Sequence, residues 1–134
     1  MFREVKHNGL LLAVIGDTQD IPQGSTFYGD GKSPLEWATF NLDKCTLLQP
    51  HVHKVRKRMD SHKTIEFLYI VQGKLRADFY DLDKNKICSE VLSAGEFVCL
   101  YDGGHGFKAL RSDTKFIEVK SGPFVGIEED KEKF

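Results

Sequence analysis

The chain has few cysteines and no cysteine pairing motif. Its 134 residues include three cysteines, at positions 45, 88 and 99. Small secreted domains that depend on disulfides carry more cysteines, in even numbers. No C-x-x-C pair is present, which argues against a zinc ribbon and a thioredoxin-type redox motif. This cysteine usage predicts a cytoplasmic protein without a disulfide framework.

Long apolar runs and an excess of one charge are also missing. The longest uninterrupted apolar run, Leu10–Ile15, is far shorter than the roughly 20 residues of a membrane-spanning helix. Gly16 and then Asp17-Thr18-Gln19-Asp20 follow this run, without a small-residue cleavage site, so the run is interpreted as a strand and not as a signal peptide. The 19 basic and 20 acidic residues give a net charge of -1, which offers no overall positive field to a polyanion. We therefore expect no membrane segment and no nucleic-acid partner.

Helical periodicity is nearly absent, and short runs of β-branched and aromatic residues take its place. Glycine, proline and aspartate-rich turns separate these runs, which predicts eight to ten strands in a single domain spanning residues 1–134. The predicted fold class is all-β: a sandwich, jelly roll or small barrel. Residues 1–46 hold the N-terminal strands, and residues 125–134 form a charged C-terminal tail. A strand is expected over Cys45–Val52, and a hairpin is expected to join Phe107–Leu110 to Phe116–Val119.

Histidines dominate the candidate chemistry. His51 and His53 are two residues apart, so on a strand both side chains point to the same face. Glu66 lies in a mostly apolar strand, where an unpaired carboxylate would be costly, so a metal ion or nearby imidazoles should pair with it. His105 stands in a glycine-rich turn, Gly103–Gly106, where the backbone can bend and approach closely. This pattern predicts that His105 adds a third imidazole to the same cavity.

The order of these residues resembles the cupin superfamily. His51-Val52-His53, then Glu66, then Gly73 after six intervening residues, is similar to the first cupin motif; Gly95 followed by Gly103-Gly104-His105 is similar to the second. The resemblance covers about residues 47–124 and is closest to small single-domain cupins. It implies a cupin-like jelly-roll β-barrel, a homodimer, and a divalent metal (Fe, Mn, Ni, Co or Zn) held by His51, His53, Glu66 and His105.

Two departures from the family pattern leave alternatives open. Twelve residues separate His53 from Glu66, where the family has three or four, whereas His62 stands at the family spacing from Glu66. His62 is therefore an alternative ligand or a residue of the cavity mouth. Tyr101 stands where the second motif has proline. The candidates for supporting the ligands are Gln49, Tyr69, Tyr80 and Tyr101.

The predicted function depends on a run of basic residues and on the expected metal ion. Lys54, Arg56, Lys57 and Arg58 lie close together and form a possible anion-binding group, although a solvated loop tip explains them as well. The resemblance implies a metal-dependent isomerase, epimerase or oxygenase that acts on a small polar or anionic metabolite such as a sugar derivative. The alternative is a non-catalytic module that binds or senses such a molecule. The third alternative is a metal-free epimerase, in which His62 as the base works with Asp60 or Glu66.

Overall fold

Antiparallel β-strands make up nearly all the regular structure of the chain. The computed structural model describes residues 2–28, 34–35, 37–41, 43–51, 54, 63–121 and 132–134, with the backbone alone described at residues 38 and 40. The strands are β1 Arg3–His7, β2 Leu10–Asp17, β3 Gly24–Tyr28, β4 Trp37–Asn41, β5 Glu66–Gln72, β6 Lys74–Tyr80, β7 Lys86–Ser93, β8 Glu96–Leu100, β9 Gly104–Ala109 and β10 Lys115–Lys120. One 3-10 turn, η1, covers Thr18–Asp20. Within the described residues, no helix has the length and apolar character needed to cross a membrane.

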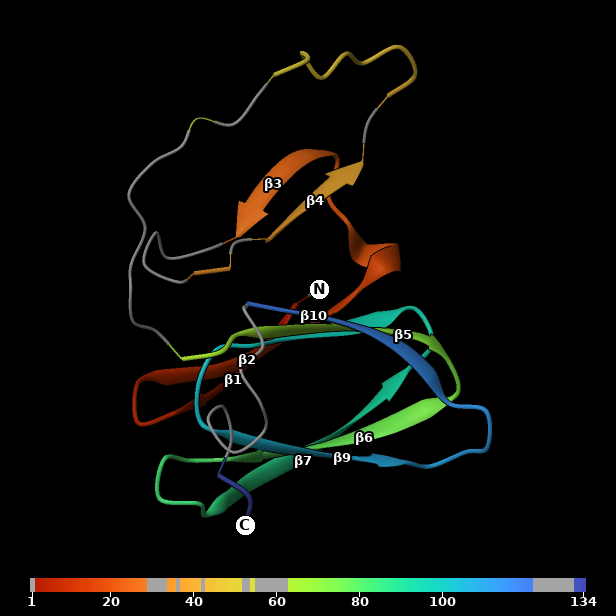
Figure 1. Cartoon of the computed structure of the whole chain (residues 1–134). Coiled ribbons are helices and arrows are strands. Elements are labelled where there is room, and N and C mark those ends of the chain that lie inside the picture. Colours follow the sequence, from red (N-terminus) through yellow and green to blue (C-terminus); the bar gives the residue numbers. More distant parts are fainter. Residues whose placement is uncertain are drawn as a thin grey trace.

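The strands form two facing sheets and a separate hairpin (Figure 1). The large sheet has the order β1-β2-β8-β5-β10, the small sheet has the order β7-β6-β9, and β3 pairs with β4 alone. The all-β prediction is confirmed. Over the described residues the two sheets form an open, two-layer arrangement rather than a closed barrel.

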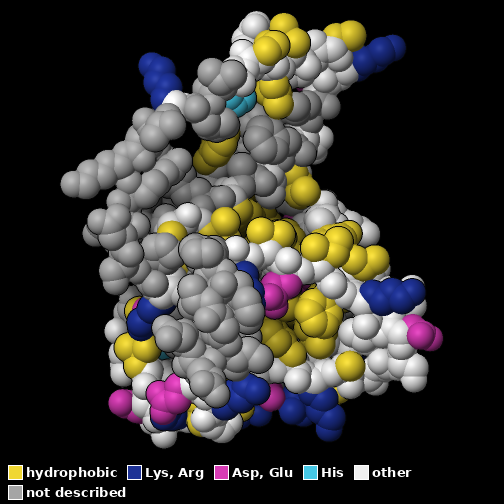
Figure 2. All heavy atoms as spheres, in the orientation of Figure 1, with side chains coloured by type: hydrophobic (Ala, Val, Ile, Leu, Met, Phe, Trp, Pro, Cys, Tyr) yellow, Lys and Arg dark blue, Asp and Glu magenta, His cyan; other side chains and the backbone are white. Residues whose placement is uncertain are grey.

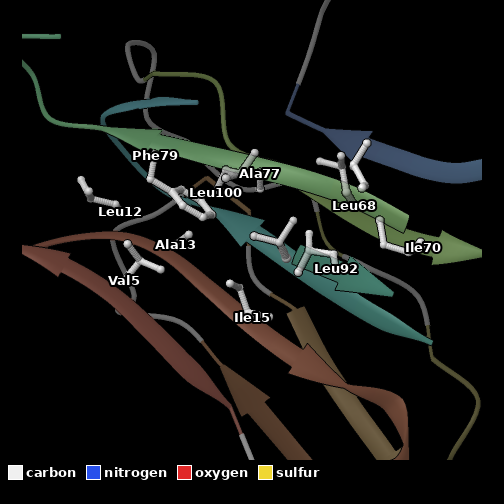
Figure 3. Packing of buried hydrophobic residues seen from close by; sticks show 12 residues of the cluster. Val5, Leu12, Ala13, Ile15, Leu68, Ile70, Ala77, Phe79, Leu92 and Leu100 are labelled. Atoms are coloured by element: carbon white, nitrogen blue, oxygen red, sulfur yellow. The ribbon is translucent and has the colours of Figure 1, made fainter. Parts of the chain in front are cut away.

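The hydrophobic core lies between the two sheets. Along β5, Glu66, Leu68 and Ile70 are buried, while the residues between them are half-buried on the other face. This alternation is expected of a strand whose successive side chains point to opposite faces. Phe79 and Leu75 bring the small sheet onto the same core, and Figure 3 shows buried side chains from both sheets converging. Glu66 is therefore directed into the interior of the sandwich.

The outer face of the large sheet carries a second, aromatic cluster. Trp37 of the hairpin lies 5.2 Å, ring centre to ring centre, from Phe97 of β8 and 6.0 Å from Phe67 of β5. Tyr28 of the hairpin stacks on Trp37 at 4.2 Å. The hairpin is thus attached to the sheet face opposite the core, as Figure 1 shows at the top of the molecule.

One predicted strand and one predicted hairpin are wrong. Residues 45–51 contain no strand: Thr46 N donates to Asp43 O in a turn, and Cys45 has a positive φ of 71°. A left-handed backbone and Pro50 both interrupt strand pairing. The expected hairpin between Phe107 and Val119 is also absent, because β9 pairs with β6 in the small sheet and β10 pairs with β5 in the large sheet.

Candidate functional site

Glu66 and His105 meet inside the sandwich although they are 39 positions apart. Their side chains come from different sheets, since β5 belongs to the large sheet and β9 to the small one. His105 Nε2 lies 3.2 Å from Glu66 Oε2. The Glu66 side chain is 6% exposed and that of His105 is 29% exposed. The carboxylate is therefore nearly enclosed, and the imidazole reaches it from the more open side.

The register of the strands explains why these two side chains point inward. Glu66 shares its face of β5 with Leu68 and Ile70, which belong to the core. His105 is directly opposite Phe79 of β6, whose ring is also part of the core. Directly opposite residues of an antiparallel pair project to the same face of the sheet. Both polar side chains therefore lie on the core-facing sides of their strands.

His105 lies within a strand rather than in a turn. The sequence pattern predicts a glycine-rich turn around it, whereas β9 begins at Gly104 and includes both flanking glycines. A Cβ at Gly104 would stand 3.0 Å from the Phe134 ring and 3.2 Å from Tyr80 Cβ. Glycine at this position lets the edge of the small sheet approach the residues around the cavity.

A cavity of about 700 Å³ surrounds the pair. This size is within the usual range for a small-molecule site. Among the described residues, four carboxylates and two lysines line it together with His105, Tyr80 and Tyr101: Glu66, Asp102, Glu118 and Glu132, with Lys63 and Lys133. Several of these charges are paired, since Lys63 Nζ lies 2.7 Å from Asp102 Oδ1 and Lys84 contacts Glu132. The cavity is hence rich in oxygen donors and favours a cation.

The Glu66–His105 spacing suits two arrangements. At 3.2 Å a protonated imidazole nitrogen can donate a hydrogen bond to the carboxylate oxygen. A similar separation, about 3 Å, is found between neighbouring oxygen and nitrogen donors that each lie about 2.1 Å from one metal ion. The donor set therefore fits a divalent ion such as Zn, Fe, Mn, Ni or Co, which imidazole and carboxylate both bind.

The other expected ligands are not brought to this pair by the described residues. His51 is exposed, and its Nδ1 lies 3.0 Å from the backbone oxygen of Gln49. His53 and His62 are outside the described residues. Over the part of the chain that is described, no group of three histidine, cysteine, aspartate or glutamate side chains is gathered for a metal. The ligand roles of His51, His53 and His62 remain predictions.

The basic run is described at a single position. Lys54 is exposed, and Arg56, Lys57 and Arg58 lie outside the described residues. Lys63, Asp102 and Phe134 also line the cavity, and they are not among the site residues that the sequence predicts. They are far apart in the chain and line the same cavity only in the folded structure.

Comparisons of this chain with protein-family models, with curated proteins and with solved structures give no match.

Proposed function

We propose that this chain is a metal-binding protein of the cupin type that acts on a small polar metabolite in the cavity between its sheets. The observation that carries the proposal is the 3.2 Å contact between Glu66 and His105 inside that cavity. A buried carboxylate costs free energy unless it is paired, so its retention beside an imidazole favours a functional role over a packing role.

The strand order supports a jelly-roll arrangement. β5 pairs with β8 and β6 pairs with β7, as in a two-stranded ribbon, while β10 lies next to β5 and β9 lies next to β6. The connections from β5 to β6, β7 to β8, β8 to β9 and β9 to β10 all pass between the sheets, which is expected when such a ribbon is rolled up. β9 and β10 are edge strands of the described sheets. Together with the six strands β5 to β10, one further strand beside each of these two edges would make the eight strands of a jelly roll. Described residues 43–51 form no strand at either edge.

In the proposed site, Glu66 and His105 hold a divalent ion, together with imidazoles from His51, His53 or His62. The ion would supply Lewis-acid or redox chemistry to a substrate oxygen. Glu118, Glu132 and Asp102 make the cavity unfavourable for a free anion, so an anionic metabolite would need the metal and Lys63 or Lys133 to bind. A sugar derivative that presents hydroxyl and carbonyl oxygens fits these requirements.

Metal content tests the proposal. We expect the purified, metal-reconstituted protein to hold about one divalent ion per chain by elemental analysis. Glu66→Gln and the double variant His51→Ala/His105→Ala should lose most of it, whereas His7→Ala should not, because His7 lies on β1 near Asp81. Thermal unfolding of each variant shows whether it folds. Folded Glu66→Gln protein that keeps a full complement of metal would refute the ligand assignment.

A metal-free role of the same pair is a second candidate, favoured by the direct contact. Glu66 accepting a hydrogen bond from His105 would orient the imidazole as a general base. A metabolite screen by thermal shift, repeated after chelation, separates the candidates. If the protein still converts a bound metabolite after chelation, the metal-free enzyme is favoured. If it binds the metabolite without converting it, a sensing module is favoured.

A further inference from the structure

A second cavity, of about 780 Å³, lies on the outer face of the large sheet. It is bounded by β1 and β2, by the β3–β4 hairpin, and by the connection that leads from β8 to β9. Figure 2 shows hydrophobic side chains on the surface between the hairpin and the two-layer body. Glu66 and His105 do not line this cavity, although Tyr101 and Asp102 line both cavities.

The lining of this outer cavity is strongly aromatic. Five rings contribute to it: Phe2, Phe27, Tyr28, Trp37 and Tyr101. Aromatic rings carry negative potential on their faces, and several rings around one space attract a cation.

The rings are held in place by contacts with one another. Tyr28 and Trp37 are stacked at 4.2 Å with an interplanar angle of 12°, and Phe2 meets Tyr28 edge-on at 5.0 Å. Trp37 Nε1 donates a hydrogen bond to the Tyr101 hydroxyl at 2.9 Å. A ligand therefore meets rings that are already positioned, which lowers the conformational entropy lost on binding.

The two charged side chains that are known to line the outer cavity are both carboxylates. Glu4 and Asp102 line it, and none of its described lining residues is a lysine, arginine or histidine. Glu4 pairs with Lys6 and Asp102 with Lys63, but the two lysine side chains are 55% and 65% exposed and lie outside the lining. Exposed ion pairs contribute little, so a cation inside the cavity can compete for the carboxylates.

We propose that the outer cavity binds a small organic cation with an alkylated ammonium group. Such a group is weakly hydrated and apolar on its surface, so it can contact the aromatic lining, on ring surfaces other than the two stacked faces of Trp37 and Tyr28, while its charge faces Glu4 and Asp102. An inorganic ion or a primary ammonium would lose more hydration energy among these rings. The volume accommodates a ligand of the size of choline, with room for a substituent.

Trp37 makes the test direct, because it is the one tryptophan of the chain and lies in the cavity wall. Choline is titrated while the fluorescence of Trp37 is recorded, at constant ionic strength maintained with potassium chloride. We expect a saturable change with a Kd of about 1 mM or lower. The uncharged molecule of the same shape, 3,3-dimethylbutan-1-ol, should bind at least about tenfold more weakly.

Carboxylate variants provide the matched comparison. Glu4→Gln should weaken choline binding several-fold, because it removes one negative charge from the lining. Glu90→Gln should leave binding unchanged, because Glu90 lies on β7, pairs with Arg3 and does not line the cavity. Both glutamates are partly exposed, so either variant should fold.

Three outcomes would overturn the proposal. Equal affinity for choline and its uncharged analogue would mean that the cavity recognises apolar shape alone. Equal affinity of wild-type protein and Glu4→Gln would remove the role of charge. The fluorescence of Trp37 could instead depend on protein concentration and not on choline. If sedimentation then shows a dimer, the cavity is an interface with a second copy of the chain.

Discussion

At the scale of single residues, two buried carboxylates are stabilised in different ways. Glu66 points into the sandwich and contacts His105. Asp78, on the outer face of the small sheet, accepts a hydrogen bond from Ser89 Oγ at 2.5 Å and contacts Lys86 and Arg76 at 3.1 Å. The first carboxylate faces a cavity that a ligand can enter, whereas the second is satisfied by its own sheet.

The environment of Asp78 predicts a pH dependence of stability. The Ser89 and Lys86 hydrogen bonds lower the pKa of Asp78 from 3.8 to about 2. Because the pKa is lower in the folded state, the stabilisation is present above about pH 4 and is lost as the pH falls toward 2. Asp78→Asn should therefore lower the melting temperature at pH 7 and reduce its drop between pH 5 and 2. A control, Asp83→Asn, changes an exposed carboxylate; equal pH profiles for both variants would contradict the assignment.

The three cysteines should differ sharply in reactivity. Burial raises the pKa of Cys99 to about 11 and also raises that of Cys88, whereas Cys45 is exposed. The thiolate is the reactive form, so at pH 8 about one Cys99 thiol in a thousand is ionised. We expect Cys45 to be alkylated first and Cys99 at least about a hundredfold more slowly, as read by peptide mapping in a mass spectrometer. Equal labelling of Cys45 and Cys99 in folded protein would contradict this order.

At the scale of elements, the connection from β8 to β9 depends on a glycine. Gly103 has a positive φ of 73°, and a Cβ there would clash with the backbone oxygen of Tyr80. Gly103→Ala should therefore cost about 2 kcal/mol or more of the free energy of unfolding. Gly106→Ala should change it by less than about 1 kcal/mol, since a Cβ at Gly106 would meet no atom within 4 Å. Urea unfolding compares the two, and similar midpoints would refute the steric argument.

Strand existence was predictable where apolar residues alternate or cluster, as in β5, β6 and β8. β1 is hard to predict because Val5 is its one buried residue, and β3 because no residue of its sequence, Gly-Ser-Thr-Phe-Tyr, is fully buried. These strands exist through pairing with β2 and β4. The apolar residues before His51 predicted a strand, but a turn at Asp43–Thr46 is formed there and residues 46–51 are not in a strand. Which sheet a strand joins depends on distant partners, which local patterns do not encode.

Part of the candidate site could be predicted from the sequence, and part depends on contacts between distant segments. The cost of an unpaired carboxylate in an apolar strand predicted a partner for Glu66, and the contact with His105 confirms it. Lys63 and Asp102 could not be predicted, because they meet only after β5 and β8 lie side by side. The outer cavity also arises from a fold contact, between Trp37 and Tyr101, that leaves no sequence signature.

At the scale of the whole molecule, the hairpin and the sandwich should differ in stability. Of the described side chains in β3 and β4, Thr39 alone is buried, whereas the sandwich core is shared by both sheets. An isolated two-stranded hairpin is marginally stable in water. We expect the fluorescence of Trp37 to change at a lower urea concentration than the far-ultraviolet circular dichroism. Coincident transitions would instead show one cooperative unit.

The pairing of β2 with β8 also has a consequence for how the chain reaches this fold. Ala13 of β2 lies opposite Leu100 of β8, so the two strands are distant in sequence although adjacent in the large sheet. At translation rates of about 5–20 residues per second, β2 leaves the ribosome several seconds before β8 exists. During that interval its apolar residues, Leu12 and Ile15 among them, have no sheet to join beyond β1. The large sheet should therefore form only after β8 has been synthesised, on the time scale of milliseconds to seconds that non-local strand pairing imposes.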